Sequence, residues 1–393
     1  MNFSLTDDQS MIRDAAADFL AEAAGSAELR TVIDRDSNSD REGEGEGDFD
    51  AVLWRQLGSE LGWCATAIPE HLGGLGLGQV ELVLLFEQMG RRLLCSPFFA
   101  TVALAANALQ LLGSAAAHQR WLPQIAAGEL RATLALAGWG VGLGEPGVTA
   151  QRSGQGWLLD GALAHVPDGA SAELLLVLAR LAEGGLGLFA VPAAAEGLGR
   201  LPCDTWDRSR PLARLTLKSL TLDAAARLDE RALDPAALQA VEARAALLLA
   251  AEQLGGAQQC LDLTLAYTAE RSQFGQKIAA FQAVKHRCAL MMVEIEATRS
   301  LVYGAAALAD SGAAAQAVRL EAGAAKARAS EAFFFCAQEA IQLHGGVGFT
   351  WEYDPHLYFK RAQASGQWLG TADQWRERVA AALLDGLEPP HAS

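Results

Sequence analysis

Two stretches of this sequence decide its fold: residues 267–278 read YTAERSQFGQKI, and residues 342–352 read QLHGGVGFTWE. Each lies at the end of a long Ala-rich segment whose apolar residues recur at helical spacing. The pattern predicts helices over 238–271, 281–310 and 316–343. Helices of that length pack against one another, so the C-terminal part of the chain is expected to be a helical bundle.

The N-terminal part is also predicted to be helical. Thr6 and Gln9 form a capping-box pattern ahead of an amphipathic segment, and helical patterns continue to residue 126. The acidic, Gly-rich run at 37–50, SNSDREGEGEGDFD, has nothing to bury and is expected to be a solvated, mobile loop. We therefore expect a helical domain over residues 1–130.

The middle of the chain has a different texture. Between residues 131 and 222, short apolar runs such as ATLALAG, AELLLVLAR and ARLTLKSLTL alternate with Gly, Pro and Asp. This pattern predicts short strands joined by turns. We expect a small antiparallel, barrel-like β domain over residues 131–225, followed by the helical bundle over 236–385.

Composition argues against several classes of function. The 393 residues are 51% hydrophobic and carry a formal net charge of -16, which opposes binding to nucleic acid or to an anionic membrane surface. No uninterrupted apolar run reaches the roughly 18 residues that a membrane helix requires. The thiols lack the spacing of a zinc site, so no metal is expected, and free thiols in a reducing cytoplasm are the better interpretation. The six cysteines are Cys64, Cys95, Cys203, Cys260, Cys288 and Cys336.

Four stretches together resemble the acyl-CoA dehydrogenase family of FAD-dependent enzymes. They are the two quoted above, the segment 54–78 that ends PEHLGGLGLG, and the segment 87–97 that reads EQMGRRLLCSP. The resemblance covers nearly the whole chain, and its most specific part is the ordered pair RSQFG and QLHGGVGF. It implies a mainly α fold with an N-terminal helical domain, a middle antiparallel β domain and a C-terminal four-helix bundle.

The resemblance also implies how the cofactor is bound. A flavin dinucleotide carries a pyrophosphate, which needs a cation and closely approaching backbone N–H groups, and Arg271, Gly345 and Gly346 supply that chemistry. In the family these elements reach FAD held largely by another protomer, so a homo- or heterotetramer with a homologous subunit is expected. The implied FAD contacts are Arg271, Phe274, Gln282, Gln342, Leu343, His344, Gly345, Gly346 and Thr371.

Several of these residues also have a structural interpretation. Arg271 is a charge at a helix C-terminus, and the two glycines end a helix. Phe274 is explained about as well by packing in a core as by flavin contact. Structural hydrogen bonding is the default role of a lone histidine such as His344. Within the full motif, the cofactor role is favoured for Arg271, and both roles are compatible for the glycines.

The chemistry of the family needs a carboxylate base, and none stands at the expected positions. The family removes an α-proton from an acyl-CoA thioester, passes a β-hydride to the flavin and delivers the electrons to an electron-transfer flavoprotein. Its usual Glu-Gly-Thr triplet reads Leu369-Gly370-Thr371 here, and a shifted gap places Gly370 at the base position. The second position used in the family falls on Ala245. Leu, Gly and Ala side chains accept no proton, so the catalytic residue is unknown.

A displaced carboxylate is the alternative to a missing one. Glu242 lies about one helical turn before Ala245, and its structural interpretation is an exposed helix residue. Glu252 and Asp373 are weaker candidates, and Glu352 is interpreted as a structural residue of the turn after HGGVGF.

The β domain departs from the family pattern as well. Leu136-Ala137-Gly138-Trp139 stands where the family has a Thr-Glu-Pro stretch against the flavin ring. The segment 164–167, AHVP, occupies the usual Trp-Ile-Thr region, and Pro167 has no backbone N–H to donate. Binding of a flavin ring by this subunit is therefore questioned.

Four functional hypotheses remain open. The first is a subunit without a base that works beside a catalytically complete homologue in a heteromeric dehydrogenase acting on fatty acyl or sterol side chains. The second is a homomeric dehydrogenase that uses Glu242. The third is a flavin monooxygenase on the same fold, and the fourth is a scaffold that does not turn over.

Overall fold

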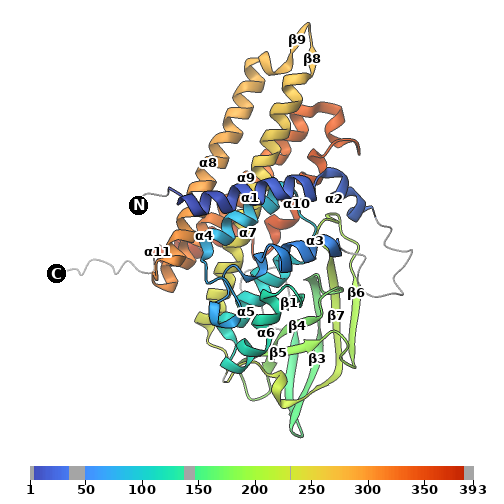
Figure 1. Ribbon diagram of the computed structural model, residues 1–393, viewed down its shortest axis with the longest axis vertical. Coiled ribbons are helices and arrows are strands. Elements are labelled where there is room, and N and C mark those ends of the chain that lie inside the picture. Colours follow the sequence, from blue (N-terminus) through green and yellow to red (C-terminus); the bar gives the residue numbers. More distant parts are fainter. Residues whose placement is uncertain (1–3, 35–48, 137–146, 231, 385–393) are drawn as a thin grey trace, which may run out of the picture. The chain divides into compact units, whose positions relative to one another are not determined.

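The computed structural model describes residues 4–34, 49–136, 147–230 and 232–384 (Figure 1). Helices precede and follow a sheet whose strands all lie between Ala132 and Leu222, which confirms the predicted order of helices, strands and helices. The predicted acidic loop at 37–50 lies outside the described residues except for its last two positions. Among the described residues, no helix combines the length and the apolar character needed to cross a membrane.

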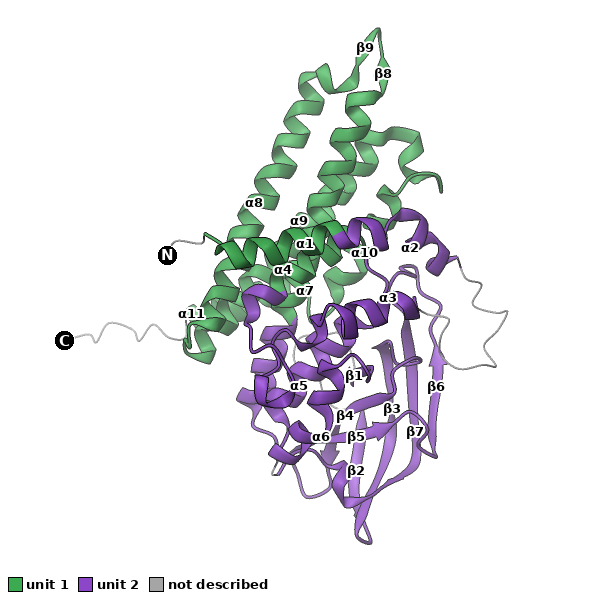
Figure 2. Ribbon diagram, in the orientation of Figure 1, with its two compact units in different colours: residues 1–18, 83–93, 246–393 green, residues 19–82, 94–245 purple. Residues whose placement is uncertain are grey.

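The chain divides into two compact units (Figure 2). Unit 1 comprises residues 1–18, 83–93 and 246–393, and unit 2 comprises residues 19–82 and 94–245. The division falls inside the longest helix, α7 (Pro235–Glu270). The boundaries at 130, 225 and 236 that the sequence suggests for three domains stay a prediction.

Unit 1 is helical. Its first helix begins where the sequence predicts, because the Thr6 hydroxyl accepts from the Gln9 N–H at 3.2 Å and the Gln9 side chain accepts from the Thr6 N–H at 3.1 Å. Helices α4 (Gln79–Arg91) and α7 approach closely at paired glycines. A Cβ on Gly255 would lie 1.8 Å from the Glu87 carbonyl oxygen, and a Cβ on Gly90 would lie 1.9 Å from the Glu252 carbonyl oxygen. The helices with residues in this unit are α1 (Asp7–Ala23), α4 (Gln79–Arg91), α7, α8 (Gln282–Asp310), α9 (Ala315–His344), α10 (Pro355–Gln367) and α11 (Ala372–Leu384), with 3-10 turns at Ile278–Ala280 and Gly345–Phe349.

Unit 2 packs short helices with a seven-stranded sheet. The order along the sheet is β1-β4-β2-β3-β7-β6, and β5 pairs with β4. The strands are β1 (Ala132–Ala135), β2 (Val148–Ser153), β3 (Gly156–Pro167), β4 (Leu174–Leu181), β5 (Leu186–Pro192), β6 (Leu198–Pro202) and β7 (Leu212–Leu222). The helical elements are α2 (Ser26–Ile33), α3 (Ala51–Arg55), α5 (Asn107–Leu112), α6 (Ala115–Ala126), π-helical segments Gln56–Glu60 and Phe99–Ala106, and 3-10 turns Trp63–Ala65, Glu70–Leu72 and Ala224–Ala226.

The sheet is not purely antiparallel. The ladders β2–β3, β3–β7, β4–β5 and β6–β7 are antiparallel, as predicted, whereas β1–β4 and β2–β4 are parallel. The parallel pairs join strands that are not consecutive in the sequence. Turn residues between consecutive strands predict hairpin pairing only, so they could not predict these crossover pairs. The apolar pattern of the strands therefore predicted the elements correctly but not all of their partners.

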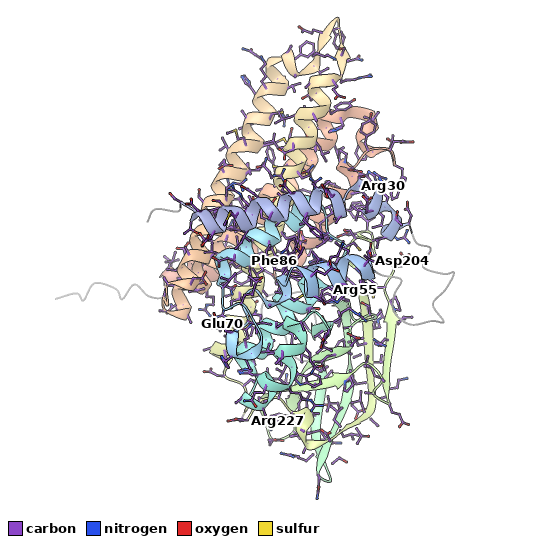
Figure 3. All side chains as sticks on the ribbon, in the orientation of Figure 1. Arg30, Arg55, Glu70, Phe86, Asp204 and Arg227 are labelled. Atoms are coloured by element: carbon purple, nitrogen blue, oxygen red, sulfur yellow. The ribbon has the colours of Figure 1, made fainter. Side chains whose placement is uncertain are left out.

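The core of the sheet centres on Trp157, which is 0% exposed and meets Phe189 edge to face with 5.1 Å between ring centroids. The Arg152 and Arg227 guanidinium carbons lie 4.1 and 5.4 Å from the centroid of the Trp157 ring. Arg227, labelled in Figure 3, also forms an ion pair with Asp229 at 2.7 Å. Aromatic and cationic side chains thus pack around Trp157 in the core of the β domain.

Candidate functional site

A two-stranded hairpin follows α7 directly and carries the first predicted motif. Strands β8 (Ser272–Gln273) and β9 (Gln276–Lys277) pair antiparallel, and the turn residues Phe274 and Gly275 both have positive φ, 51° and 80°. That is the conformation of a two-residue hairpin turn, which a glycine adopts readily and a phenylalanine does not. The β8–β9 hairpin lies at the tip of unit 1 (Figure 2). Phe274 is 92% exposed, so the interpretation of Phe274 as a core aromatic is wrong.

The hairpin is connected to the start of α8. The Phe274 and Phe281 rings meet edge to face with 6.3 Å between centroids, and the Arg271 carbonyl accepts from the Ile278 N–H at 2.9 Å. Arg271 and Gln282 are both exposed. The structure therefore gathers Arg271, Phe274 and Gln282 at one end of unit 1.

The second motif ends α9. Gly345 adopts φ 64°, which favours glycine, and both Gly345 and Gly346 are exposed. A Cβ built on either glycine would meet none of the surrounding described atoms within 4 Å. Gln342 is exposed and Leu343 half-buried. The backbone here is open to close approach by a ligand, and a guanidinium such as that of Arg271 suits a pyrophosphate.

An aromatic stack joins the two motifs. The Tyr267 ring stacks on the His344 ring with 4.3 Å between centroids and 20° between planes. The Tyr353 ring stands edge-on to both, at 5.8 Å from Tyr267 and 6.1 Å from His344. Tyr267 lies four residues before Arg271, and His344 immediately precedes Gly345. The stack therefore ties the end of α7 to the end of α9.

His344 faces inward. It is 5% exposed, and its Nδ1 lies 2.7 Å from the Ala340 carbonyl oxygen, so Nδ1 carries the proton in the neutral ring. Burial lowers the pKa of His344, which favours that neutral form. The hydrogen-bonding role expected for a lone histidine is confirmed. Sequence reasoning missed Tyr267 as its partner, although Tyr267 stands one helical turn before Arg271 on the same helix face.

Thr371 lies in a different part of unit 1. It begins α11 with a reciprocal cap: its hydroxyl accepts from the Gln374 N–H at 3.3 Å, and its N–H donates to the Gln374 side chain at 2.9 Å. The preceding carbonyl, that of Gly370, accepts from Lys326 on α9. Lys326 precedes His344 by 18 residues on α9, a rise of about 27 Å for a regular helix. The predicted FAD contacts therefore fall into a hairpin group and a separate Thr371 position.

Leu369 and Ala245, where the resemblance places the base, are both apolar and buried. Leu369 is 2% exposed with φ 54°, and its carbonyl oxygen accepts from the Trp375 indole N–H at 2.9 Å. Ala245 is 0% exposed. Glu242 is 2% exposed, so its interpretation as an exposed helix residue is wrong, because this part of α7 is apolar on most of its faces and is buried.

The other carboxylates have structural partners or lie at the surface. Glu252 pairs with the buried Arg361 at 2.5 Å. Asp373 pairs with Arg376 at 2.9 Å and has a side chain that is 95% exposed. Glu352 is exposed. A carboxylate held by a buried guanidinium is stabilised in its charged form and is a poor proton acceptor.

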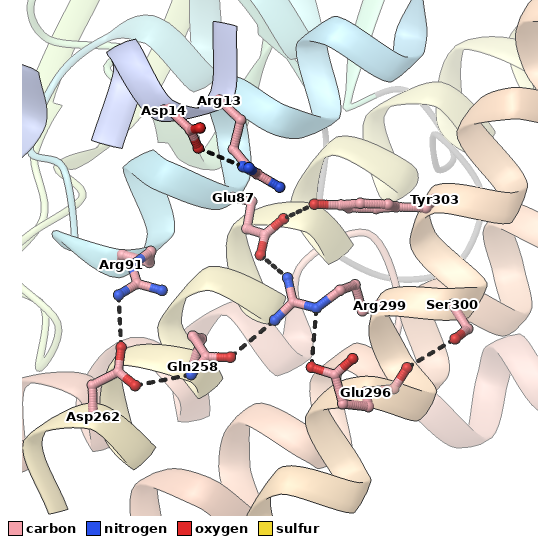
Figure 4. A network of polar contacts seen from close by, with 10 residues as sticks. All are labelled: Arg13, Asp14, Glu87, Arg91, Gln258, Asp262, Glu296, Arg299, Ser300 and Tyr303. Atoms are coloured by element: carbon pink, nitrogen blue, oxygen red, sulfur yellow. Dashed lines mark hydrogen bonds and ion pairs between the residues drawn. The ribbon is translucent and has the colours of Figure 1, made fainter. Parts of the chain in front are cut away.

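A partly buried polar network in unit 1 joins α4 to α7 and α8 (Figure 4). Glu87 accepts from Arg299, and from the Tyr303 hydroxyl at 2.6 Å. Arg299 also donates to Gln258 at 2.9 Å. Burial, and next the Glu87 carboxylate, raise the pKa of Tyr303. The network holds α4, α7 and α8 together.

Two segments of the β domain depart from the family pattern, and the structure fully describes the one at 164–167. His165 is exposed with φ 58° at an irregularity between Leu163 and Val166 in β3. Pro167 ends that strand opposite Leu212. The two residues are not hydrogen-bonded to each other, because the next N–H, that of Asp168, donates to the Pro211 carbonyl at 2.9 Å and the Leu212 carbonyl accepts from the Cys203 N–H at 2.8 Å. The N–H that proline lacks therefore costs the ladder with β7 no bond. Of the other stretch, only Leu136 is described, and Ala137, Gly138 and Trp139 lie outside the described residues. No group of three metal-binding side chains occurs among the residues that the structure covers.

Comparison with known proteins gives consistent family matches. The N-terminal domain profile of the acyl-CoA dehydrogenases matches residues 6–129, and the C-terminal domain profile matches residues 237–384. The chain is 32% identical over 363 residues to the acyl-CoA dehydrogenase IpdE2 of Mycobacterium tuberculosis, covering 92% of this chain and 93% of that protein.

Solved structures agree. A variant of the Tcur3481-Tcur3483 steroid ACAD superposes with a TM-score of 0.82 at 33% identity, over 97% of this chain and 98% of that one. A chain of the ChsE4-ChsE5 complex from Mycobacterium tuberculosis superposes with a TM-score of 0.85 at 27% identity, over 99% of this chain and all of that one. The chain therefore belongs to the acyl-CoA dehydrogenase family, whose members are FAD-dependent oxidoreductases that act on acyl-CoA.

Proposed function

We propose that this chain is the subunit without a base of a heteromeric acyl-CoA dehydrogenase. The observation that carries the proposal is a contrast within one chain. Leu369 and Ala245, where the resemblance places the base, are apolar and buried, whereas Arg271, Gln282 and the glycines of the second motif are exposed and have the chemistry that a flavin pyrophosphate needs. Abstraction of an α-proton needs a positioned acceptor, so a homologous partner supplies it.

The two separated groups of FAD contacts support assembly of more than one subunit. The hairpin group, namely Arg271, Phe274, Gln282 and the run 342–346, would hold the pyrophosphate end of FAD bound mainly by a neighbouring subunit. Thr371 follows the Gly370 carbonyl held by Lys326, which precedes His344 by about 27 Å of helix rise, and it would contact a different FAD. The flavin accepts the hydride when bound, and an electron-transfer flavoprotein would take up the electrons.

Exposed apolar side chains in unit 1 support the same conclusion. On α8, Leu290, Met292 and Val293 are 53%, 58% and 61% exposed. Clustered apolar surface of this kind is typical of subunit interfaces. We infer that α8 packs against a homologous subunit in a homo- or heterotetramer, and the relatives named after pairs, ChsE4-ChsE5 and Tcur3481-Tcur3483, favour the heteromer.

One observation favours a second candidate. Glu242 is a buried carboxyl about one turn before Ala245 on the same helix, which is compatible with a homomeric dehydrogenase that uses a displaced base. The chain alone would then oxidise an acyl-CoA, and Glu242→Gln would abolish that activity.

The proposal is tested by anaerobic titration of the FAD-loaded protein with straight-chain and steroid-bearing acyl-CoA thioesters. The chain is titrated alone, with a homologue encoded beside it, and as Glu242→Gln, while bleaching of the flavin band is followed. Bleaching only with the homologue present supports the heteromer. Bleaching by the lone chain that is lost in Glu242→Gln supports the second candidate. Absence of bleaching in every mixture contradicts both.

A further inference from the structure

A buried lysine contacts the turn that carries Leu369, Gly370 and Thr371. Lys326 on α9 is 0% exposed. Its Nζ lies 2.7 Å from the Ser330 hydroxyl, 3.4 Å from the Ser365 carbonyl oxygen and 3.3 Å from the Gly370 carbonyl oxygen. Two of these acceptors are backbone groups that bracket the turn between α10 and α11.

A second buried donor fixes the same turn. Trp375 is 1% exposed, and its indole N–H donates to the Leu369 carbonyl oxygen at 2.9 Å. Consecutive carbonyls, those of Leu369 and Gly370, are therefore each held by a side chain from a neighbouring element. The residue that follows is Thr371. Its hydroxyl oxygen accepts from the Gln374 N–H, and the hydroxyl proton of Thr371 takes no part in that capping bond.

Burying an amine in this place is unfavourable by itself. Loss of solvation lowers the pKa of Lys326 to about 7, and an apolar side chain of similar length would avoid that penalty. Lys326 cannot act as the missing base, because its amine is wholly buried and a proton acceptor must reach the substrate. What the amine does reach is the backbone of the turn.

We propose that Lys326 is a positioning residue for Thr371: it holds the Ser365 and Gly370 carbonyls so that the Thr371 hydroxyl is presented to a phosphate or ribityl oxygen of FAD. The inference rests on the proposed function, because it takes Thr371 as an FAD contact. It assigns a role to a residue of α9 that touches no cofactor itself.

The chain offers a matched control. Ser330→Ala removes a hydrogen-bonding partner of Lys326 but leaves both backbone acceptors of the turn, while Lys326→Met removes the donor to all three. Lys326→Gln, which is shorter and keeps donors, serves if Lys326→Met does not fold. Hydrogen exchange of residues 366–376 and affinity for FAD are measured on the assembled protein for each variant, and folding is checked by circular dichroism.

We expect Lys326→Met to raise amide exchange in 366–376 and to weaken FAD binding about tenfold, the equivalent of one to two oriented hydrogen bonds. Ser330→Ala should leave both near the wild-type values even where it lowers the melting temperature. A double-mutant cycle with Thr371→Val should be non-additive, because both changes act on one contact.

Three results overturn the inference: unchanged exchange in Lys326→Met, an equal loss of FAD affinity in Ser330→Ala, or additive effects of Lys326→Met and Thr371→Val. If the wild-type assembly binds no FAD, the proposed function fails and the role of Thr371 fails with it. The exchange measurement still decides in that case whether Lys326 holds the turn.

Discussion

At the scale of single residues, the proposal that this chain lacks a base can be tested by gain of function at Leu369. Leu369→Glu restores the Glu-Gly-Thr triplet at the turn before Thr371. Because a positioned general base contributes about 10²–10⁴-fold to proton transfer, we expect this variant to gain acyl-CoA-dependent flavin bleaching without a partner subunit. Stopped-flow absorbance measures the rate, and Leu369→Gln, similar in size but not basic, should stay inactive. Equal rates for the two variants would contradict a missing base at this position.

Lys326 makes stability depend on pH with a definite sign. Its pKa in the folded chain is about 7, against 10.5 for an ordinary lysine. Between these two values the unfolded state binds more protons than the folded state, so the free energy of unfolding rises as pH increases from about 7 to 10.5. As pH falls to about 7 this contribution to stability is lost. We expect this slope in the wild type, in chemical denaturation from pH 6.5 to 9.5, and its loss in Lys326→Met. Lys218→Met, at an exposed position, should keep the slope, and a wild-type slope in Lys326→Met would contradict the assignment.

At the scale of elements, the stack between α7 and α9 sets the geometry of the hairpin group. Tyr267→Leu removes the ring that lies 4.3 Å from His344, a contact that contributes about 0.5–1.5 kcal/mol beyond buried area. We expect weaker FAD binding by isothermal titration, because Arg271 and Gly345 would lose their fixed separation. Tyr267→Phe keeps the ring and should bind like the wild type. Equal losses in the two variants would instead point to the hydroxyl.

The approach of α4 to α7 depends on the absence of a side chain. A Cβ on Gly255 would lie 1.8 Å from the Glu87 carbonyl oxygen, so Gly255→Ala must push the helices apart and should destabilise by about 1–3 kcal/mol or more. Gly366 on α10 meets nothing within 4 Å, and Gly366→Ala should stabilise by about 0.4–1 kcal/mol through the unfolded state. Chemical denaturation measures both, and a stable Gly255→Ala protein would contradict this packing.

At the scale of the whole molecule, the exposed apolar residues of α8 predict association. Val293→Asp places a charge on a side chain that is 61% exposed in the isolated chain. If the position is buried between subunits, the unpaired charge is strongly unfavourable, and light scattering should show a smaller assembly with an unchanged fold. Val52 on α3 is 57% exposed, and Val52→Asp should leave the assembly intact. Dissociation by both variants would indicate a general effect of charge.

Periodicity and local motifs were sufficient to predict the main elements of the fold, although α2 and the β8–β9 hairpin were not predicted. The Thr6 cap, the long C-terminal helices and the strands between Ala132 and Leu222 all follow from residues close in sequence. Pairing of strands was less accessible, because the parallel contacts of β4 with β1 and β2 join segments separated by other strands. A hydrophobic pattern records which face of a strand is buried but not which strand lies beside it.

The sequence by itself determined the family, and it led to the predictions that Arg271 and Gly345 contact a flavin and that Ala245 and Leu369 stand where the base is expected, since these depend on the identity of residues at fixed spacings. Only the tertiary structure decided that Glu242 is buried, that Tyr267 stacks on His344, and that Lys326 reaches the Gly370 carbonyl. These contacts join residues more than 40 positions apart or depend on what surrounds a helix. The burial of a side chain and the direction of its hydrogen bonds arise when the helices pack, and helical periodicity does not encode them.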